Sequence, residues 1–154
     1  MSNPIGTFTC KLDSKGRLSL PSDFREQLGE QADDYFVMRP GLHGTYLELY
    51  TMSEWLRQEE IFMKLNHFDK QTQEFVRAYI DGSRRTKLDA SGRILIPKEL
   101  LDRVNLSKDV VINSMFTNME IWDKELYEAQ VGKLSSEELA KGIESLFAGF
   151  SFGA

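Results

Sequence analysis

One short phrase occurs twice in this chain, and the repetition constrains the fold more than any other feature. Residues 11–21 read KLDSKGRLSLP, and residues 87–97 read KLDASGRILIP, 76 positions later. Residues 47–55 and 119–127 are also alike but lie 72 positions apart, so the first half has four additional residues, expected in the loop at 40–44. Repetition of several segments in the same order indicates two copies of one structural unit.

The repeated phrase predicts two short strands joined by a tight turn. Residues 7–20 alternate apolar and polar side chains on both sides of a polar segment, which is typical of a hairpin. Asp13 can accept hydrogen bonds from backbone N–H groups of the turn, and Gly16 can adopt the positive φ that a sharp turn requires. Asp89 and Gly92 occupy the same places in the second copy, so we assign them the same turn-shaping role.

The rest of each unit is predicted as a short helix followed by further strands. Pro21 and Pro97 lack a backbone N–H and suit a helix start, and apolar strands are predicted at residues 35–38 and 110–112. Apolar periodicity and capping residues predict four further helices, at residues 52–65, 70–80, 124–131 and 135–147. We therefore predict an α+β fold of two tandem βαβ-like modules with added helices.

These patterns divide the chain into four segments. The modules at residues 6–51 and 83–123 are separated by a helical insertion at residues 52–82 and followed by C-terminal helices at residues 124–150. The chain of 154 residues fits one ordinary domain, and a module of this size buries too little surface to be stable alone. We expect the two modules to share one core.

Composition excludes several classes of protein. A hydrophobic content of 41% with 28% charged residues is typical of a globular protein, and no apolar run approaches the roughly 20 residues that cross a membrane. The first residues lack the features of a signal peptide, so we expect a cytoplasmic location and no membrane partner. The single cysteine, Cys10, lies in a predicted strand and is expected to be a packed thiol.

The residues that metal and catalytic sites require are scarce. The two histidines, His43 and His67, have no cysteine or histidine at ligand spacing. The chain also lacks a glycine-rich phosphate loop and a nucleophile elbow. We therefore expect no metal, no cofactor and no enzymatic activity.

Charge is distributed unevenly along the chain. The net charge of −5 by itself argues against a nucleic-acid partner. Residues 84–108, however, hold seven basic against three acidic side chains, whereas the residues from 109 onward hold eight acidic against three basic ones. Such a chain can present a basic face although its total charge is negative, and a mixed solvated surface is the alternative.

The predicted turns carry the cations best suited to DNA. Arg17 and Arg93 each directly follow a turn glycine. An arginine on a rigid turn can bind guanine or a phosphate through two parallel hydrogen bonds. In the alternative interpretation, each arginine pairs with Asp13 or Asp89 and only fixes the turn. The candidate DNA-binding residues are Lys15, Gly16, Arg17, Arg84, Arg85, Lys87 and Arg93.

The doubled pattern Asp-x-x-Gly-Arg-apolar-x-apolar-Pro, at residues 13–21 and 89–97, resembles the AbrB-like swapped-hairpin DNA-binding superfamily. Two copies in a chain of this length resemble its MraZ family, and the resemblance covers residues 6–146. It implies that the two modules form an intramolecular pseudo-dimer, a barrel in which their hairpins interlace. The family's DNA contacts carry over to Lys15, Gly16 and Arg17. At the second turn Ser91 replaces the lysine, so equal participation of both turns is an open question.

The resemblance also implies a function. Proteins of this kind are transcriptional regulators, usually repressors, of their own division and cell-wall gene cluster. They bind double-stranded DNA at short G-rich direct repeats in the promoter, which implies association with the nucleoid. They assemble into homo-oligomeric rings of about eight or more subunits, a closed symmetry that repeats one interface.

An interaction module is the rival interpretation. In AbrB-like antitoxins the same hairpins or helices also bind a protein partner, so this chain could act as an antitoxin-like protein or a scaffold. A long partner-binding tail would favour that interpretation, and here the C-terminal segment is short and predicted to be helical.

Overall fold

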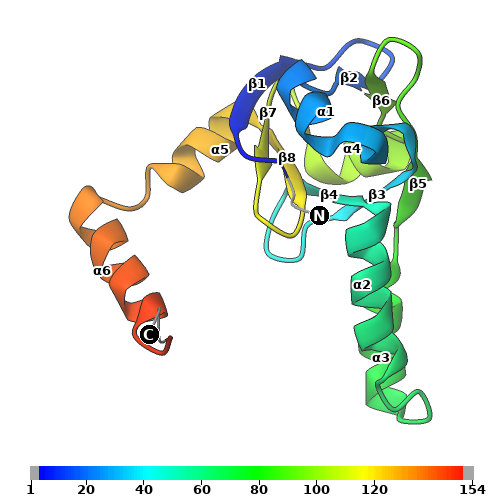
Figure 1. Ribbon diagram of the computed structural model, residues 1–154, viewed down its shortest axis with the longest axis vertical. Helices are drawn as coiled ribbons and strands as arrows, with labels where there is room; N and C mark the ends of the chain where they lie inside the picture. Colours follow the sequence, from blue (N-terminus) through cyan, green and yellow to red (C-terminus); the bar gives the residue numbers. More distant parts are fainter. Residues whose placement is uncertain (1–3, 151–154) are drawn as a thin grey trace. The chain divides into compact units, whose positions relative to one another are not determined.

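The computed structural model describes residues 4–150, which form two compact units that divide after Lys124. The N-terminal unit contains all the strands of the described chain together with helices α1 to α4 (Figure 1). The C-terminal unit contains helices α5 and α6. The predicted α+β fold class is confirmed.

The two halves of the chain contain the same elements in the same order, apart from one 3-10 helix. The first half contributes β1 (Thr7–Lys11), β2 (Arg17–Ser19), α1 (Ser22–Leu28), the 3-10 helix η1 (Gly29–Asp33), β3 (Phe36–Pro40), β4 (Leu47–Thr51), α2 (Met52–Met63) and α3 (Lys70–Ile80). The second half contributes β5 (Arg84–Thr86), β6 (Arg93–Leu95), α4 (Lys98–Val104), β7 (Asp109–Ser114), β8 (Met119–Asp123), α5 (Lys124–Val131) and α6 (Ser136–Phe147). Each half therefore reads ββαββαα, and the βαβ prediction describes only its middle.

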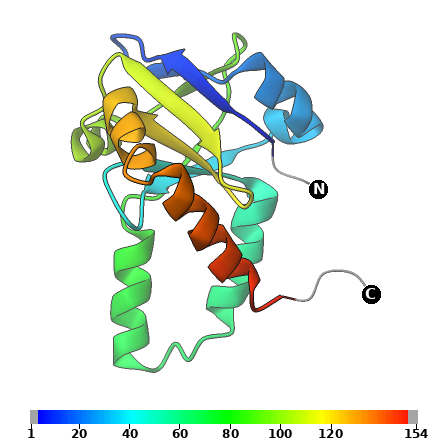
Figure 2. The same ribbon diagram turned by 90° about the vertical axis from the view of Figure 1, so that its left-hand side faces the viewer.

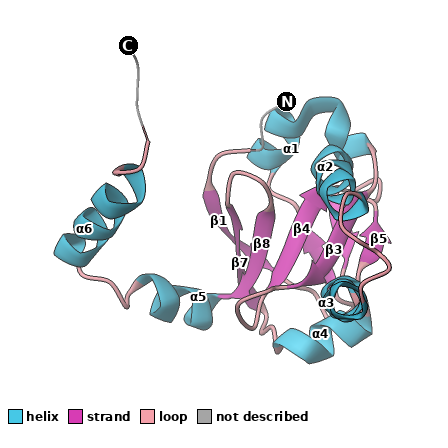
Figure 3. Cartoon of the chain, turned by 90° about the horizontal axis from the view of Figure 1, so that it is seen from below, coloured by secondary structure: helices cyan, strands magenta, loops and turns pink. Residues whose placement is uncertain are grey.

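Six strands form one antiparallel sheet in the order β1-β7-β8-β4-β3-β5 (Figure 3), and β2 pairs separately with β6. The first strand of each half thus pairs with the other half, β1 with β7 and β5 with β3. The predicted hairpin is wrong in its pairing, because β1 and β2 meet only at the single bridge between Leu12 and Leu18. Alternation along a strand shows which face is buried and does not identify the neighbouring strand.

A local twofold axis relates the two halves. Leu18 in β2 lies opposite Ile94 in β6, and these are equivalent residues of the repeated phrase. Glu48 in β4 lies opposite Glu120 in β8, and these are equivalent residues of the second repeated segment. A residue can face its own counterpart in an antiparallel pair only on a twofold axis, so both pairs mark the same internal symmetry.

The four additional residues of the first half are divided between two places. Thr51 and Asp123 are equivalent, and they pair with Phe36 and Val110, which lie 74 positions apart. Two of the residues are therefore inserted before β3, in the segment that forms η1. Only the other two lie between β3 and β4, where the sequence had suggested all four.

The shared core forms where the short helices cover the strands. Phe24 of α1 and Leu100 of α4 are fully buried at equivalent positions, and burying a phenylalanine contributes about 1.5–3 kcal/mol. Gly29 ends α1 with φ of 59°. Cys10 packs against the core, and burial raises the pKa of its thiol to about 11. The predictions of a common core and of a packed thiol are confirmed.

Helices α2 and α3 extend from the sheet as a hairpin (Figures 1 and 2). Thr51 and Asp69 cap their N-termini by accepting hydrogen bonds from Glu54 N and Thr72 N. The hairpin exposes many apolar side chains, including Phe75, which is 68% exposed. Its apolar surface is therefore incompletely covered by the rest of the N-terminal unit.

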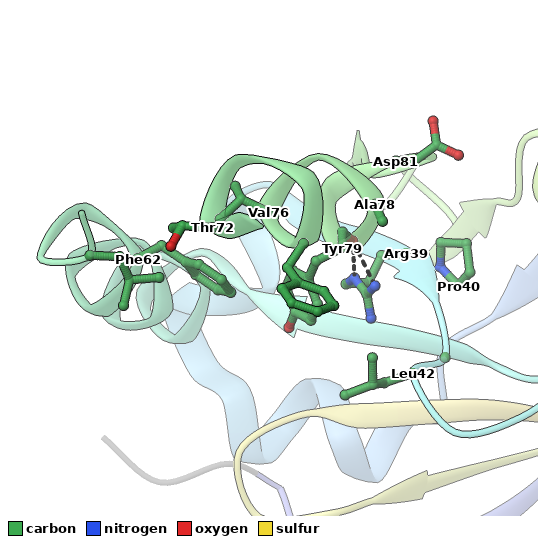
Figure 4. Close-up of a pocket in the computed structure, with 12 residues that line it drawn as sticks. Arg39, Pro40, Leu42, Phe62, Thr72, Val76, Ala78, Tyr79 and Asp81 are labelled. Atoms are coloured by element: carbon green, nitrogen blue, oxygen red, sulfur yellow. Dashed lines mark hydrogen bonds between the residues drawn. The ribbon is translucent and has the colours of Figure 1, made fainter. Parts of the chain in front are cut away.

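One buried arginine holds α3 to the sheet. Arg39 of β3 donates from Nε and Nη2 to the carbonyl oxygen of Tyr79, at 3.2 and 2.6 Å, and stacks on the Tyr79 ring (Figure 4). Its Nη1 donates to Glu48 Oε1 at 2.9 Å. At the equivalent place in the second half, Asn113 donates to Glu120 instead. Among the described residues, only the first half therefore has an arginine that joins its second long helix to the sheet.

The C-terminal unit is an amphipathic pair of helices. Ser135 and Glu138 form the predicted capping box at the start of α6, in which each side chain accepts from the other's backbone N–H. Leu139, Ile143 and Leu146 lie along one side of α6 and are 42–68% exposed. The helix therefore presents an uncovered apolar stripe.

Candidate nucleic-acid interface

The two turns of the repeated phrase lie at one end of the N-terminal unit. The β1–β2 connection and the β5–β6 connection are both at the top in Figures 1 and 2, and the α2–α3 hairpin extends from the opposite end. The turns are also tied to each other, because Ile96 N donates to Gly16 O at 2.8 Å and Leu20 N donates to Gly92 O at 3.0 Å. Each turn is therefore held by the residue that follows a short strand of the other half.

The carboxylate of Asp13 accepts three hydrogen bonds within the first turn. Its Oδ1 accepts from the backbone N–H groups of Lys15 and Arg17, both at 2.9 Å, and its Oδ2 accepts from Arg17 Nε at 2.7 Å. Asp13 N donates to Arg17 O at 3.0 Å, which closes the turn from the backbone side. The Arg17 backbone N–H and then its guanidinium lower the pKa of the Asp13 carboxyl below its usual value.

The second turn repeats this arrangement with its own residues. Asp89 Oδ1 accepts from Ser91 N at 2.8 Å and from Arg93 N at 3.0 Å, and Asp89 Oδ2 accepts from Arg93 Nε at 3.0 Å. Hydrogen bonding to the Arg93 backbone is the main cause that lowers the pKa of Asp89. Gly16 and Gly92 have φ of 80° and 76°, so the predicted need for glycine at both turns is confirmed.

The aspartate holds only one edge of each arginine. The side chains of Arg17 and Arg93 are each 32% exposed, and their Nε atoms make the ion pairs with Asp13 and Asp89. Within residues 4–150, none of their Nη atoms has a hydrogen-bond or ion-pair partner. The two interpretations of the sequence are therefore compatible: the internal pair orients the guanidinium and leaves its outer edge available to a ligand.

The remaining candidates lie in different surroundings. Lys15 is exposed at the tip of the first turn, where the second turn has Ser91. Arg84 forms an exposed ion pair with Glu99 of α4 at 2.8 Å. Arg85 of β5 and Lys87, which follows that strand, lie over one aromatic ring, with Arg85 Cζ at 4.3 Å and Lys87 Nζ at 5.3 Å from the centre of Tyr35.

One cation at the second turn was missed from the sequence. Arg25 of α1 places its guanidinium against Gly92, in a cleft of about 380 Å³ that Lys87 and Asp89 also line. Nothing in the spacing of the repeated phrase marks this residue, because the contact depends on how the two halves pack. Tertiary structure alone brings Arg25 to the turn.

Other parts of the surface differ in character from the turns. A cleft of about 550 Å³ between α3 and the β3–β4 loop is mostly apolar (Figure 4). Among residues 4–150, no three His, Cys, Asp or Glu side chains are grouped so that they could hold a metal ion. No helix in the described part of the chain is long and apolar enough to span a membrane.

Acidification is expected to open both turns. Because the folded pKa values of Asp13 and Asp89 lie below the ordinary value of 3.8, their stabilising contribution is complete above that value and is lost as the pH falls through the folded pKa. The protection of the Arg17 and Arg93 amides against hydrogen exchange, relative to the intrinsic exchange rate at each pH, should therefore be high at pH 6 and fall below about pH 4, near the ordinary carboxyl pKa. Asp13→Asn is the control, because its amide oxygen still accepts but does not titrate, and its Arg17 amide should stay protected. Equal loss of protection in that variant would contradict the assignment.

Comparison with known proteins identifies the family. The sequence profile of the family described as "MraZ protein, putative antitoxin-like" matches residues 5–78 and 80–149. This chain belongs to the MraZ family. Both halves lie within the matched residues, and each matched segment includes one ββαββ set and most of the helices that follow it.

Several MraZ proteins with assigned names are similar to this chain along most of its length. A protein of Flavobacterium psychrophilum is 40% identical over 131 residues, which cover 85% of this chain and 83% of that protein. A protein of Christiangramia forsetii is 38% identical over 152 residues, covering 99% and 97%, and one of Caldicellulosiruptor saccharolyticus is 37% identical over 144 residues, covering 92% and 97%. Each of the three is named "Transcriptional regulator MraZ".

Proposed function

We propose that this protein is a sequence-specific, DNA-binding transcriptional regulator and that the two turns read the DNA. The observation that carries the proposal is the geometry of Arg17 and Arg93, which lie on equivalent turns at one end of the unit with their Nη edges unpaired among residues 4–150. The names of the similar MraZ proteins support a role in transcription.

The chemistry of the turns fits duplex DNA. A guanidinium whose Nε edge is already held can present its two outer nitrogens to O6 and N7 of a guanine. Lys15 has an exposed side chain beside Arg17 and suits a backbone phosphate, which fixes the position of the protein without reading sequence. This division of roles favours G-rich sites.

The family resemblance supplies the finer part of the proposal. We take the sites to be short G-rich direct repeats in the promoter of the protein's own division and cell-wall gene cluster, and the effect on transcription to be repression. Binding there would place the protein in the cytoplasm, on the nucleoid. The proposed DNA-contacting residues are Lys15, Gly16, Arg17, Arg84, Arg85, Lys87 and Arg93, with Asp13, Asp89 and Gly92 shaping the turns.

We also propose a swapped-hairpin pseudo-dimer that assembles into a ring of about eight or more subunits. The exchange of β1 and β5 between the halves supports the interlaced barrel. The exposed apolar stripe of α6 supports self-assembly, because apolar surface of this kind favours burial. The proposed division of the chain is 6–51, 52–82, 83–123 and 124–150, with the two helical segments as equivalent parts of the repeat.

Binding to the promoter should depend steeply on the number of repeats and on salt. One subunit offers few cations, so affinity must come from several subunits that engage neighbouring repeats on one duplex. A gel-shift titration of DNA upstream of the protein's own gene, with one to four repeats and across a salt series, measures both dependences. Equal binding to a scrambled duplex of the same length would contradict the proposal.

A protein-interaction module is the second candidate. The description "antitoxin-like" and the exposed stripe Leu139, Ile143 and Leu146 favour it. If the purified protein fails to bind its promoter but still assembles, the interaction module becomes the better account of the turns and helices.

A further inference from the structure

The guanidinium of Arg25 lies directly on the backbone of the second turn. A methyl group placed on Gly92 would lie 2.7 Å from Arg25 Nη1 and 2.8 Å from its Cζ. A side chain at position 92 would therefore displace the flexible end of Arg25 from the place that it occupies here. The φ of 76° at Gly92 separately favours glycine.

The equivalent contact in the other half is apolar. Leu101 of α4 occupies the place of Arg25, 76 positions later, and its Cδ1 would lie 3.1 Å from a methyl group on Gly16. The same helix position thus covers both turns, with a leucine over the first turn and a guanidinium over the second.

The two turns also differ in the residue at the tip, and this difference in charge is opposite in sign to the difference between Leu101 and Arg25. The first turn carries Lys15 at its tip, whereas the second has the neutral Ser91. Counting only the tip and the covering helix, each turn then has one cation besides its arginine: Lys15 in the first and Arg25 in the second. The charge missing from the second tip is replaced by α1 of the opposite half.

The bonding of Arg25 leaves it available to a ligand. Its Nε donates weakly to Leu20 O at 3.3 Å, which fixes the root of the guanidinium. Within residues 4–150 its Nη atoms have no hydrogen-bond or ion-pair partner, and the side chain is exposed. The cleft beside it is also lined by Lys87, Asp33 and Asp89, and Asp89 is already bonded to Arg93. The Nη atoms of Arg25 are therefore hydrogen-bond donors at this turn that an anion could bind.

We propose that Arg25 binds a backbone phosphate of the DNA held at the second turn, so that α1 of one half completes the interface of the other. This inference rests on the proposed function. A phosphate suits the site because a guanidinium binds it through two parallel hydrogen bonds. Arg93 follows Gly92 on the turn itself, whereas Arg25 reaches the turn from a helix at its side, which suits a contact with the backbone more than one with a base edge.

Arg25→Leu tests the proposal, because leucine is the residue at the equivalent position of the other half. For each engaged subunit, loss of one charged phosphate contact should weaken binding about tenfold, and should do so equally on a duplex with one promoter repeat and on a scrambled duplex. The slope of log affinity against log salt should fall by about 0.9 for each engaged subunit. Arg25→Lys should restore the slope, because it restores the charge.

Arg57→Leu is the matched control. Arg57 lies on α2 with a side chain 73% exposed and paired with Glu54, so the same change of charge and size occurs away from the turns. Its affinity and salt slope should equal those of the native protein. If Arg57→Leu lowers the slope as much as Arg25→Leu does, a general charge effect replaces the proposed contact.

Two further results would overturn the proposal in distinguishable ways. If the native protein binds and Arg25→Leu has the native affinity and slope, Arg25 makes no phosphate contact and the proposed function stands. If affinity falls while the slope is unchanged, Arg25 only shapes the turn through Leu20. Failure of the native protein to bind either duplex would instead reject the proposed function, and this inference with it.

Discussion

Arg17→Ala is expected to abolish binding to the promoter repeats while the protein stays folded and assembled. The variant would lose the two proposed hydrogen bonds from the guanidinium to guanine, and each such bidentate contact provides about 1–3 kcal/mol of discrimination against other bases. Several subunits are proposed to engage one promoter, so the loss is multiplied across the repeats. The substitution removes only a side chain that is 32% exposed and leaves the backbone hydrogen bonds to Asp13 in place.

A gel-shift titration of the Arg17→Ala variant measures this effect, with circular dichroism and sedimentation to confirm that fold and assembly are native. Arg93→Ala should weaken binding less, because the family's DNA contacts carry over to the first turn, whereas the second turn departs from the family pattern at Ser91. Native affinity of Arg17→Ala would reject the assignment of the first turn. An equal loss in both variants would show that the two turns participate equally.

Arg39→Ala is expected to destabilise the N-terminal unit by about 3–5 kcal/mol, the usual result of removing one partner from a buried ion pair. Arg39 is 3% exposed and Glu48 is 7% exposed, so the substitution leaves the Glu48 carboxylate buried without its cation. It also removes both hydrogen bonds to Tyr79 O. Helix α3 should then lose its attachment to β3.

Urea unfolding of Arg39→Ala measures the loss, and hydrogen exchange along α3 shows whether the helix detaches. The double variant Arg39→Leu with Glu48→Leu should recover part of the stability, because no buried charge is then left unpaired. Arg103→Ala, which breaks the exposed pair with Asp81, should change stability by no more than about 1 kcal/mol. If Arg39→Ala lost equally little stability, the role of Arg39 in holding α3 to the sheet would be contradicted.

The sequence predicted the local structure of this protein well because the signals are local. Asp13 and Gly16 act within a few residues of themselves, through a side-chain acceptor and a positive φ, and each has the expected role. The helices α3, α5 and α6 begin and end where periodicity and capping residues placed them. The family resemblance rests on the same local phrase.

The sequence could not show contacts that depend on packing between the halves. The pairing of β1 with β7 joins residues about a hundred positions apart, and alternation does not encode a partner. Arg25 over Gly92 and Arg39 beneath Tyr79 follow from the same tertiary arrangement. In the sequence, Arg25 and Arg39 look like ordinary charged residues. The equivalent positions of the other half hold Leu101 and Asn113, so the repeat does not mark either arginine.

Joining the two halves in one polypeptide lets them diverge in a way that two identical chains cannot. A homodimer presents the same face to a duplex whichever way it is turned, and so matches palindromes. Here two pairs of equivalent positions hold different residues. Lys15 corresponds to Ser91, and Arg25 corresponds to Leu101. The surface that we propose to read DNA is therefore not symmetric, and we expect it to distinguish the two directions along a double helix.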